Sequence, residues 1–71
     1  MQQLDARGLS CPEPVLRARR VIQTLGSGGE VEILVETVTS RENVSRAARS
    51  LGCEVRVESR EDGYHLRIRK P

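Results

Sequence analysis

The chain is poor in aromatic residues and in long apolar runs. It has 71 residues, no Phe or Trp, and a single Tyr, Tyr64. Its core must therefore consist of Val, Leu, Ile and Ala, and almost no side chain is present on which RNA bases could stack. The longest aliphatic run, residues 33–35, is far too short to span a membrane. We therefore expect neither a membrane segment nor a nucleic-acid partner.

Cysteine, histidine and net charge are also scarce. Cys11 and Cys53 are too few for a disulfide framework, and His65 has no sequence neighbour with which to bind a metal. The first residues alternate between polar and apolar, so no signal peptide is visible. A net charge of +2, with acids and bases interleaved, gives little attraction to polyanions. These features indicate a cytoplasmic protein with no metal or other cofactor.

The first half of the chain predicts a strand, a helix and a second strand. Residues 2–6 form a short strand that a turn at Gly8 ends, and the helix runs from Pro12 to about Leu25. Its apolar positions recur at helical spacing: Val15, Ala18, Ile22 and Leu25. A glycine-rich loop follows at 26–29, and then a half-buried strand whose apolar residues alternate: Val31, Ile33 and Val35.

The second half predicts another helix and a hairpin. The pattern Thr39-x-x-Glu42 is a capping-box signature for the start of that helix, and Gly52 ends it. Its expected apolar stripe is Val44, Ala47, Ala48 and Leu51. Two alternating strands follow around a turn at Asp62-Gly63, with these apolar residues: Cys53, Val55, Val57, Tyr64, Leu66 and Ile68.

The order β-α-β-α-β-β predicts an α+β fold, a two-layer α/β sandwich in one domain covering residues 1–71. One apolar face per strand and one stripe per helix place both helices on the same face of the sheet. A right-handed crossover makes the first two strands parallel, and the hairpin makes the four-stranded sheet mixed. Its outer face should be solvated and charged, although it could also dock a partner: Glu32, Glu36, Glu54, Arg56, Glu58, Arg67 and Arg69.

The segment Cys11-Pro12-Glu13-Pro14 is the candidate functional site. Proline is favoured as the first helical residue, so we expect Pro12 there and Cys11 at the N-cap, where the positive end of the helix dipole stabilises a thiolate. The alternative register makes Ser10 the cap, with Ser10-x-x-Glu13 as a capping box.

The surroundings of the two thiols differ. Arg7 could add positive charge near Cys11, whereas Glu13 would oppose the effect if its carboxylate points back. A thiolate is the nucleophile of sulfur chemistry, so we predict that Cys11 is reactive. Cys53 begins a strand on its apolar side, and we expect it to be buried and structural. His65 should face out from an exposed strand and serve neither as base nor as ligand.

Residues 4–14, LDARGLSCPEP, resemble the opening signature of the TusA/SirA family of small sulfur carriers. That signature is a short strand, a D-x-R/x-G-L-x-C-P-x-P stretch and then a helix, so the matching site residues are Arg7, Gly8, Cys11, Pro12, Glu13 and Pro14. The resemblance implies strand order 1-2-4-3 and a persulfide on Cys11. It also implies two kinds of partner: a sulfur donor, such as a cysteine desulfurase or rhodanese, and a sulfur-acceptor protein.

Within the family, Arg41-Glu42-Asn43-Val44 and the step at 52–55 are similar to the N-terminal domain of YedF-like proteins. Residues 36–40 lack the acidic, proline-containing segment of the tRNA-thiolation carrier. The YedF branch implies selenium as an alternative cargo and commonly a second, DsrE-related domain. Both a stand-alone protein and a module of a longer one fit this resemblance.

Two other classes of function remain open. One is a thiol-redox protein in which Cys11 and Cys53 form a reversible disulfide, although no Cys-x-x-Cys spacing is present. The other is an RNA-binding or protein-interaction module without sulfur transfer, against which the scarcity of aromatics and of a concentrated basic patch argues.

Overall fold

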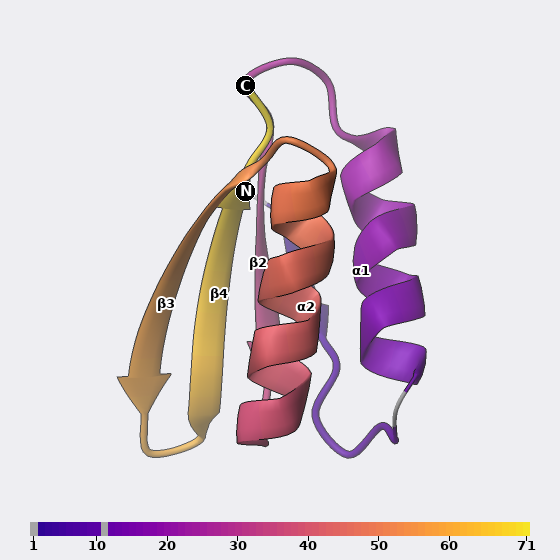
Figure 1. Cartoon of the computed structure of the whole chain (residues 1–71). Helices are drawn as coiled ribbons and strands as arrows, with labels where there is room; N and C mark the ends of the chain where they lie inside the picture. Colours follow the sequence, from indigo (N-terminus) through magenta and orange to yellow (C-terminus); the bar gives the residue numbers. More distant parts are fainter. Residues whose placement is uncertain (1, 11) are drawn as a thin grey trace.

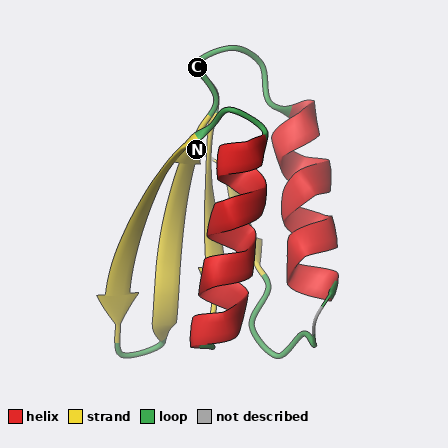
Figure 2. Cartoon of the chain, in the orientation of Figure 1, coloured by secondary structure: helices red, strands yellow, loops and turns green. Residues whose placement is uncertain are grey.

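Two helices pack side by side on one face of a four-stranded sheet (Figures 1 and 2). The computed structural model describes residues 2–10 and 12–71. Along the chain the elements are β1 (Gln2–Asp5), α1 (Glu13–Thr24), β2 (Glu30–Val35), α2 (Val38–Ser50), β3 (Glu54–Arg60) and β4 (Gly63–Arg69). The predicted order β-α-β-α-β-β and the α+β sandwich are confirmed. In the part of the chain described, neither helix is long and apolar enough to cross a membrane.

The sheet has the strand order β1-β2-β4-β3, as expected. β1 pairs parallel with β2, whereas β4 pairs antiparallel with β2 and with β3. Leu4, Ile33 and Leu66 are successive partners across the sheet, so their side chains form one row toward the helices. The register therefore places the alternating apolar residues of the strands on a common face.

The core is a thin aliphatic layer between the sheet and the helices. Its fully buried side chains include Ala18, Ile22, Val31, Ile33, Val35, Val44, Ala48, Leu66 and Ile68. Cys53 is also buried, at 7% exposure, which confirms its expected place. Leu51 and Val57, predicted as core residues, are instead 37% and 44% exposed. Leu51 follows the last residue of α2, and Val57 lies on the edge strand β3, so each lacks cover on one side.

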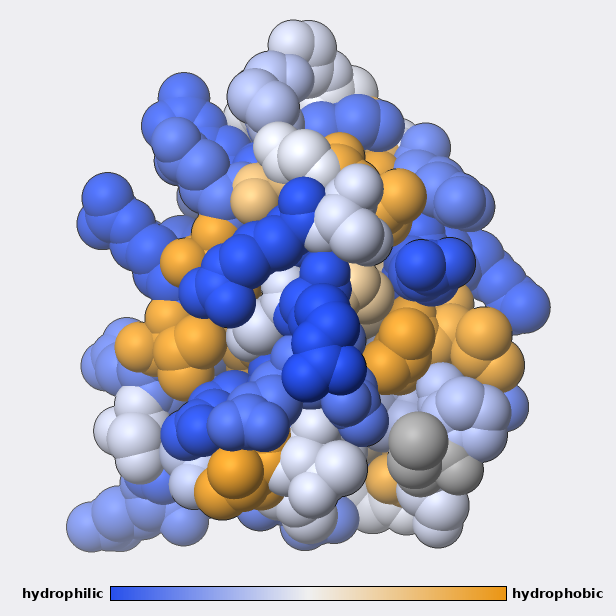
Figure 3. All heavy atoms as spheres, viewed as in Figure 1, coloured by the Kyte–Doolittle hydropathy of each residue, from blue (hydrophilic) through white to orange (hydrophobic). Residues whose placement is uncertain are grey.

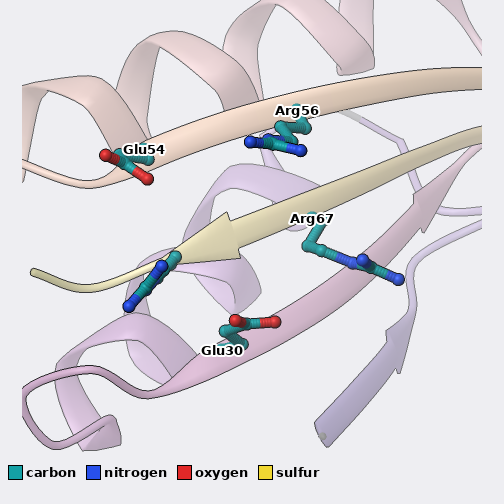
Figure 4. A pocket seen from close by; sticks show the side chains of 5 residues that line it. Glu30, Glu54, Arg56 and Arg67 are labelled. Carbon is teal, nitrogen blue, oxygen red and sulfur yellow. The ribbon is translucent and has the colours of Figure 1, made fainter.

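The opposite face of the sheet carries charged side chains. Glu30, Glu54, Arg56, Arg67 and Arg69 line a shallow hollow there (Figure 4). Arg69 lies between Glu30 and Glu54 in the register, which places opposite charges side by side. Arg56 is opposite Arg67, an unfavourable like-charge pair. The prediction of a charged outer face is therefore correct for β3 and β4.

The predicted start of α1 is wrong by one residue. The helix begins at Glu13, and Pro12 is the N-cap, with φ −97° and no side-chain hydrogen bond to the first turn. The N–H of Leu16 donates to the carbonyl of Pro12 at 3.1 Å, and the N–H of Glu13 donates to that of Ser10 at 2.9 Å. Neither expected register therefore describes the cap, and the geometry predicted for Cys11 concerns a residue outside the described part of the chain.

The predicted cap of α2 is also wrong. Thr37, not Thr39, is the N-cap, because its extended backbone (φ −118°, ψ 153°) lets its hydroxyl accept a hydrogen bond from the N–H of Ser40 at 3.0 Å. Helix α2 begins at Val38, so Thr39 lies within its first turn and Glu42 is not part of a capping box.

Replacing Thr37 tests this assignment. Thr37→Ala should lower the free energy of unfolding by about 1 kcal/mol, because the N–H of Ser40 loses its acceptor. Thermal unfolding followed by circular dichroism should show Tm lower by roughly 4–8 °C. The matched control is Thr39→Ala, which should change stability by less than about 0.5 kcal/mol. Equal losses from the two substitutions would contradict the assigned cap.

Candidate functional site

The loop before α1 is fastened to the end of β2. The N–H of Ala6 donates to the carbonyl of Leu34 at 2.9 Å, which extends the pairing of β1 with β2 by one residue. Gly8 has φ +80°, and its N–H donates to Oε1 of Glu36 at 2.6 Å. A residue with a side chain is strained at that φ, so glycine suits the turn. Glu36, expected on the open sheet face, instead holds the loop that leads to the Cys11 motif.

Arg7 connects this loop to the β3–β4 turn. Its Nε and Nη2 lie 2.9 and 2.8 Å from the two carboxylate oxygens of Asp5, and its Nη1 lies 3.4 Å from Oδ2 of Asp62. The hydrogen bonds from Arg7 lower the pKa of Asp5 to about 2, and Asp5 in turn raises the pKa of Arg7. The guanidinium is thus shared between two carboxylates, so its main structural effect is to brace the loop.

His65 is on the outer sheet face, as predicted, but it is only 7% exposed. Its Nε2 lies 2.9 Å from Oδ1 of Asp62, and its Nδ1 lies 3.5 Å from Oε1 of Glu32. The expectation of an exposed histidine is therefore wrong, because these neighbours cover the ring. The hydrogen bond with His65 lowers the pKa of Asp62, and one from Gln3 is the main cause of the lowered pKa of Glu32. Since the ring lies on the face away from the helices, we assign it a structural role.

The motif residues of the first turn of α1 have distinct surroundings. Pro12 is exposed, whereas Pro14, the second helical residue, is almost fully buried. A proline at that position removes an N–H that has no partner within the helix. The carboxylate of Glu13 points along the helix, with Oε2 at 3.2 Å from Nε of Arg17. Arg17 thus partly compensates the charge of Glu13, which does not point back.

A groove between α1 and α2 begins at the motif. It is lined by Pro12, Val15, Arg19, Asn43, Arg46, Ala47 and Ser50. On this helix-covered side, apolar residues form separate patches among hydrophilic ones (Figure 3). Sequence reasoning did not find this groove, because its walls come from two helices whose relative position no local pattern specifies. The small side chains of Ala47 and Ser50 on α2 were the one feature of the sequence that could have indicated a groove between the helices.

The described residues offer one thiol and no metal site. Cys53 is free and buried, and its N–H donates to the carbonyl of Ala48 at 3.0 Å just beyond α2. Residues 2–10 and 12–71 contain no group of three His, Cys, Asp or Glu side chains arranged to hold a metal ion. Cys11 lies outside the described residues, so its predicted role rests on the sequence.

The effect of Arg7 on Asp5 can be measured directly. In Arg7→Gln the pKa of Asp5 should rise from about 2 toward its ordinary value of 3.8, as followed by carbon-detected NMR of the carboxyl group. Because folding lowers this pKa, the stabilisation is present above about pH 4 and is lost as the pH falls toward 2. Arg17→Gln is the control and should leave Asp5 unchanged. An Asp5 that still titrates near 2 in Arg7→Gln would contradict the assigned cause.

Known proteins resemble the chain along nearly its whole length. The sequence profile of the family described as "Sulfurtransferase TusA" matches residues 2–70. The sulfur carrier protein TusA of Allochromatium vinosum is 35% identical over 71 residues, which cover 97% of this chain and 92% of the relative. A putative sulfur carrier protein of Archaeoglobus fulgidus is 39% identical over 64 residues, 89% of this chain and 83% of the relative.

A solved structure shows the same fold. The crystal structure of a SirA-like protein from Desulfitobacterium hafniense matches with a TM-score of 0.85 and 33% sequence identity. The match covers 97% of this chain and 95% of the other. Profile, relatives and fold agree with the resemblance of the Cys11 motif. The chain belongs to the TusA family of sulfurtransferases.

Proposed function

We propose that this protein is a sulfur carrier that holds persulfide sulfur on Cys11 between a donor enzyme and an acceptor. The observation that carries the proposal is the burial of Cys53 at 7% exposure, which leaves Cys11 as the thiol that can serve a partner. Membership in a family whose relatives are named sulfur carriers supports it. The domain is taken as residues 1–71, and the setting as the cytoplasm.

The transfer needs two thiol exchanges and no net oxidation. The Cys11 thiolate attacks the terminal sulfur of a donor persulfide, so a new S–S bond forms on Cys11 and the donor thiolate leaves. An acceptor thiolate then attacks the terminal sulfur on Cys11, and the Cys11 thiolate leaves in turn. Each step conserves electrons, so the carrier itself needs no metal or redox cofactor.

The donor we propose is a cysteine desulfurase or a rhodanese, and the acceptor is another protein with a reactive thiol. Because Pro12 lines one end of the groove between α1 and α2, a partner that reaches Cys11 must approach that end. Arg19 and Arg46 in the groove favour acidic side chains on the partner. Sulfur is the proposed cargo, and selenium is the alternative implied by the resemblance to the YedF branch.

Buried Cys53 also argues against the thiol-redox alternative. A disulfide would have to join Cys11 to a sulfur in the core, next to the end of α2. To react, the buried sulfur of Cys53 would have to become accessible, which requires the residues packed around it to move. The RNA-binding alternative lacks aromatic side chains for base stacking: the single Tyr64 has Cζ of Arg41 over its ring, 4.9 Å from the ring centroid.

Two cysteine variants test the proposal. After incubation with a desulfurase and its substrate, Cys53→Ser should gain the mass of one sulfur atom, and Cys11→Ser should gain none. Intact-mass spectrometry before and after reduction measures this. Circular dichroism should show that both variants remain folded. Persulfide found on Cys11→Ser and absent from Cys53→Ser would refute Cys11 as the carrier site.

The two prolines should affect different properties. Pro14→Ala removes a buried side chain and should lower the free energy of unfolding by roughly 1–2 kcal/mol. Pro12→Ala alters an exposed residue and should change it by less than about 0.5 kcal/mol. Loading of Cys11 should nevertheless slow by about tenfold in Pro12→Ala, because a reacting group must be held in place. Rapid-quench loading and denaturant unfolding separate the effects. A wild-type loading rate in Pro12→Ala would mean that Pro12 only marks the helix start.

A further inference from the structure

Strand β3 forms a long edge of the sheet. It runs from Glu54 to Arg60, contains no proline, and has only β4 as a neighbour among the described strands (Figure 1). The side chain of Val57, at the middle of the strand, is 44% exposed. The unpaired N–H and C=O groups of such an edge can serve as a template for pairing with another strand.

The turn register shows which backbone groups of β3 are free. Arg60 and Gly63 are partners across the two-residue turn and exchange hydrogen bonds, so alternate residues of β3 direct their N–H and C=O toward β4. The intervening residues direct their N–H and C=O groups toward the open edge of the sheet. None of these groups forms a hydrogen bond with another residue that the structure describes. The intervening residues are Val55, Val57 and Ser59.

The charges on this strand alternate in sign along one face. Glu54, Arg56, Glu58 and Arg60 all project from the outer face of the sheet, and Figure 4 shows the first two there. If a second copy of the strand lies antiparallel to it with Val57 opposite Val57, each charged residue faces a residue of opposite charge. Moving the centre by one residue, to Arg56 or Glu58, instead places like charges face to face. The edge is therefore complementary to itself in one register.

We propose that β3 pairs antiparallel with β3 of a second copy of this chain, with Val57 on the two-fold axis. Glu54 then faces Arg60, Val55 faces Ser59, Arg56 faces Glu58, and Val57 faces Val57, each pair joining the two copies. Every free N–H and C=O of the strand gains a partner, and the two sheets become one sheet of eight strands. The exposed Val57 side chains come into contact on the helix side.

The dimer leaves the site of sulfur chemistry free. A two-fold axis perpendicular to the sheet keeps all helices on one face and turns the second copy end over end. The loops before α1, which lie at the end of the molecule with the β3–β4 turn (Figure 1), then point to opposite ends. One seven-residue edge buries little area, so the dimer is weak and reversible.

Sedimentation velocity of the full chain, from about 1 μM to about 1 mM, measures the equilibrium. The wild type should pass from monomer to dimer as concentration rises. Val57→Pro should abolish dimers, because it removes an outward N–H without removing a bond to β4. Arg56→Glu and Glu58→Arg should each raise the dissociation constant by about tenfold, since symmetry creates two like-charge pairs.

Mixing the two charge variants tests whether the charges of one β3 strand pair with those of the other. Arg56→Glu has acids at positions 56 and 58, and Glu58→Arg has bases at both, so the mixture should form heterodimers more tightly than either variant forms homodimers. Arg20→Glu, the same charge reversal at an exposed position of α1, is the control and should leave dimerisation unchanged. Circular dichroism should confirm that each variant is folded.

A wild type that stays monomeric at the highest concentration would overturn the proposal. So would dimers unaffected by Val57→Pro, or a mixture that associates no better than its components. The measurement involves no sulfur transfer, so its failure would leave the proposed carrier function untouched.

Discussion

The packing of the central strands β2 and β4 against the helices, with α1 on β2 and α2 on β4, is the interaction on which the rest of the fold depends. Val31, Ile33 and Val35 have no exposed surface on the helix side, and Leu34 on the other side is only 6% exposed. Each such side chain contributes about 1.5–3 kcal/mol when buried. With no Phe or Trp, the core has no larger side chain, so the aliphatic residues of these two central strands position the helices and the edge strands.

The outer face of the sheet supports the candidate site in another way. The carboxylate of Asp62, in the β3–β4 turn, interacts with the side chains of both Arg7 and His65. Arg7 also forms an ion pair with Asp5 at the end of β1. These contacts join the first loop to the far hairpin, 55 residues later in the chain. Exposed ion pairs add little stability individually, so their main effect is to restrict the loop that leads to the Cys11 motif.

Local sequence patterns correctly predicted the type and the approximate position of each helix and strand. Alternation and helical spacing identified all six elements, and the resemblance supplied the strand order that the structure confirms. The errors arose where distant segments meet. Alternation placed His65 on the outer face but could not reveal the cover from Asp62 and Glu32. Val57 matched the apolar pattern, and the expected strand order placed it at an edge, but the pattern does not show how much of that edge the helices cover.

The caps failed for a different reason. Thr37 and Thr39 are both acceptable N-caps, and the glutamate at position 42 favoured the wrong one. The positions of Pro12 and Pro14 are likewise compatible with more than one starting residue for α1, because a proline is tolerated throughout the first turn. The residue at the N-cap is set by where tertiary packing makes the helix begin. The local sequence limits that starting point only to a few residues.

A pulse–chase of labelled sulfur tests the central claim, that the chain accepts sulfur and gives it up again. The protein is loaded by a desulfurase, separated from it, and then exposed to a thiol acceptor, while intact mass and label are followed. A carrier should hold one labelled sulfur on Cys11 after separation, release it to the acceptor, and return to its original mass ready for reloading. Label that never leaves the protein, or a loss of two hydrogens that signals a Cys11–Cys53 disulfide, would contradict the account.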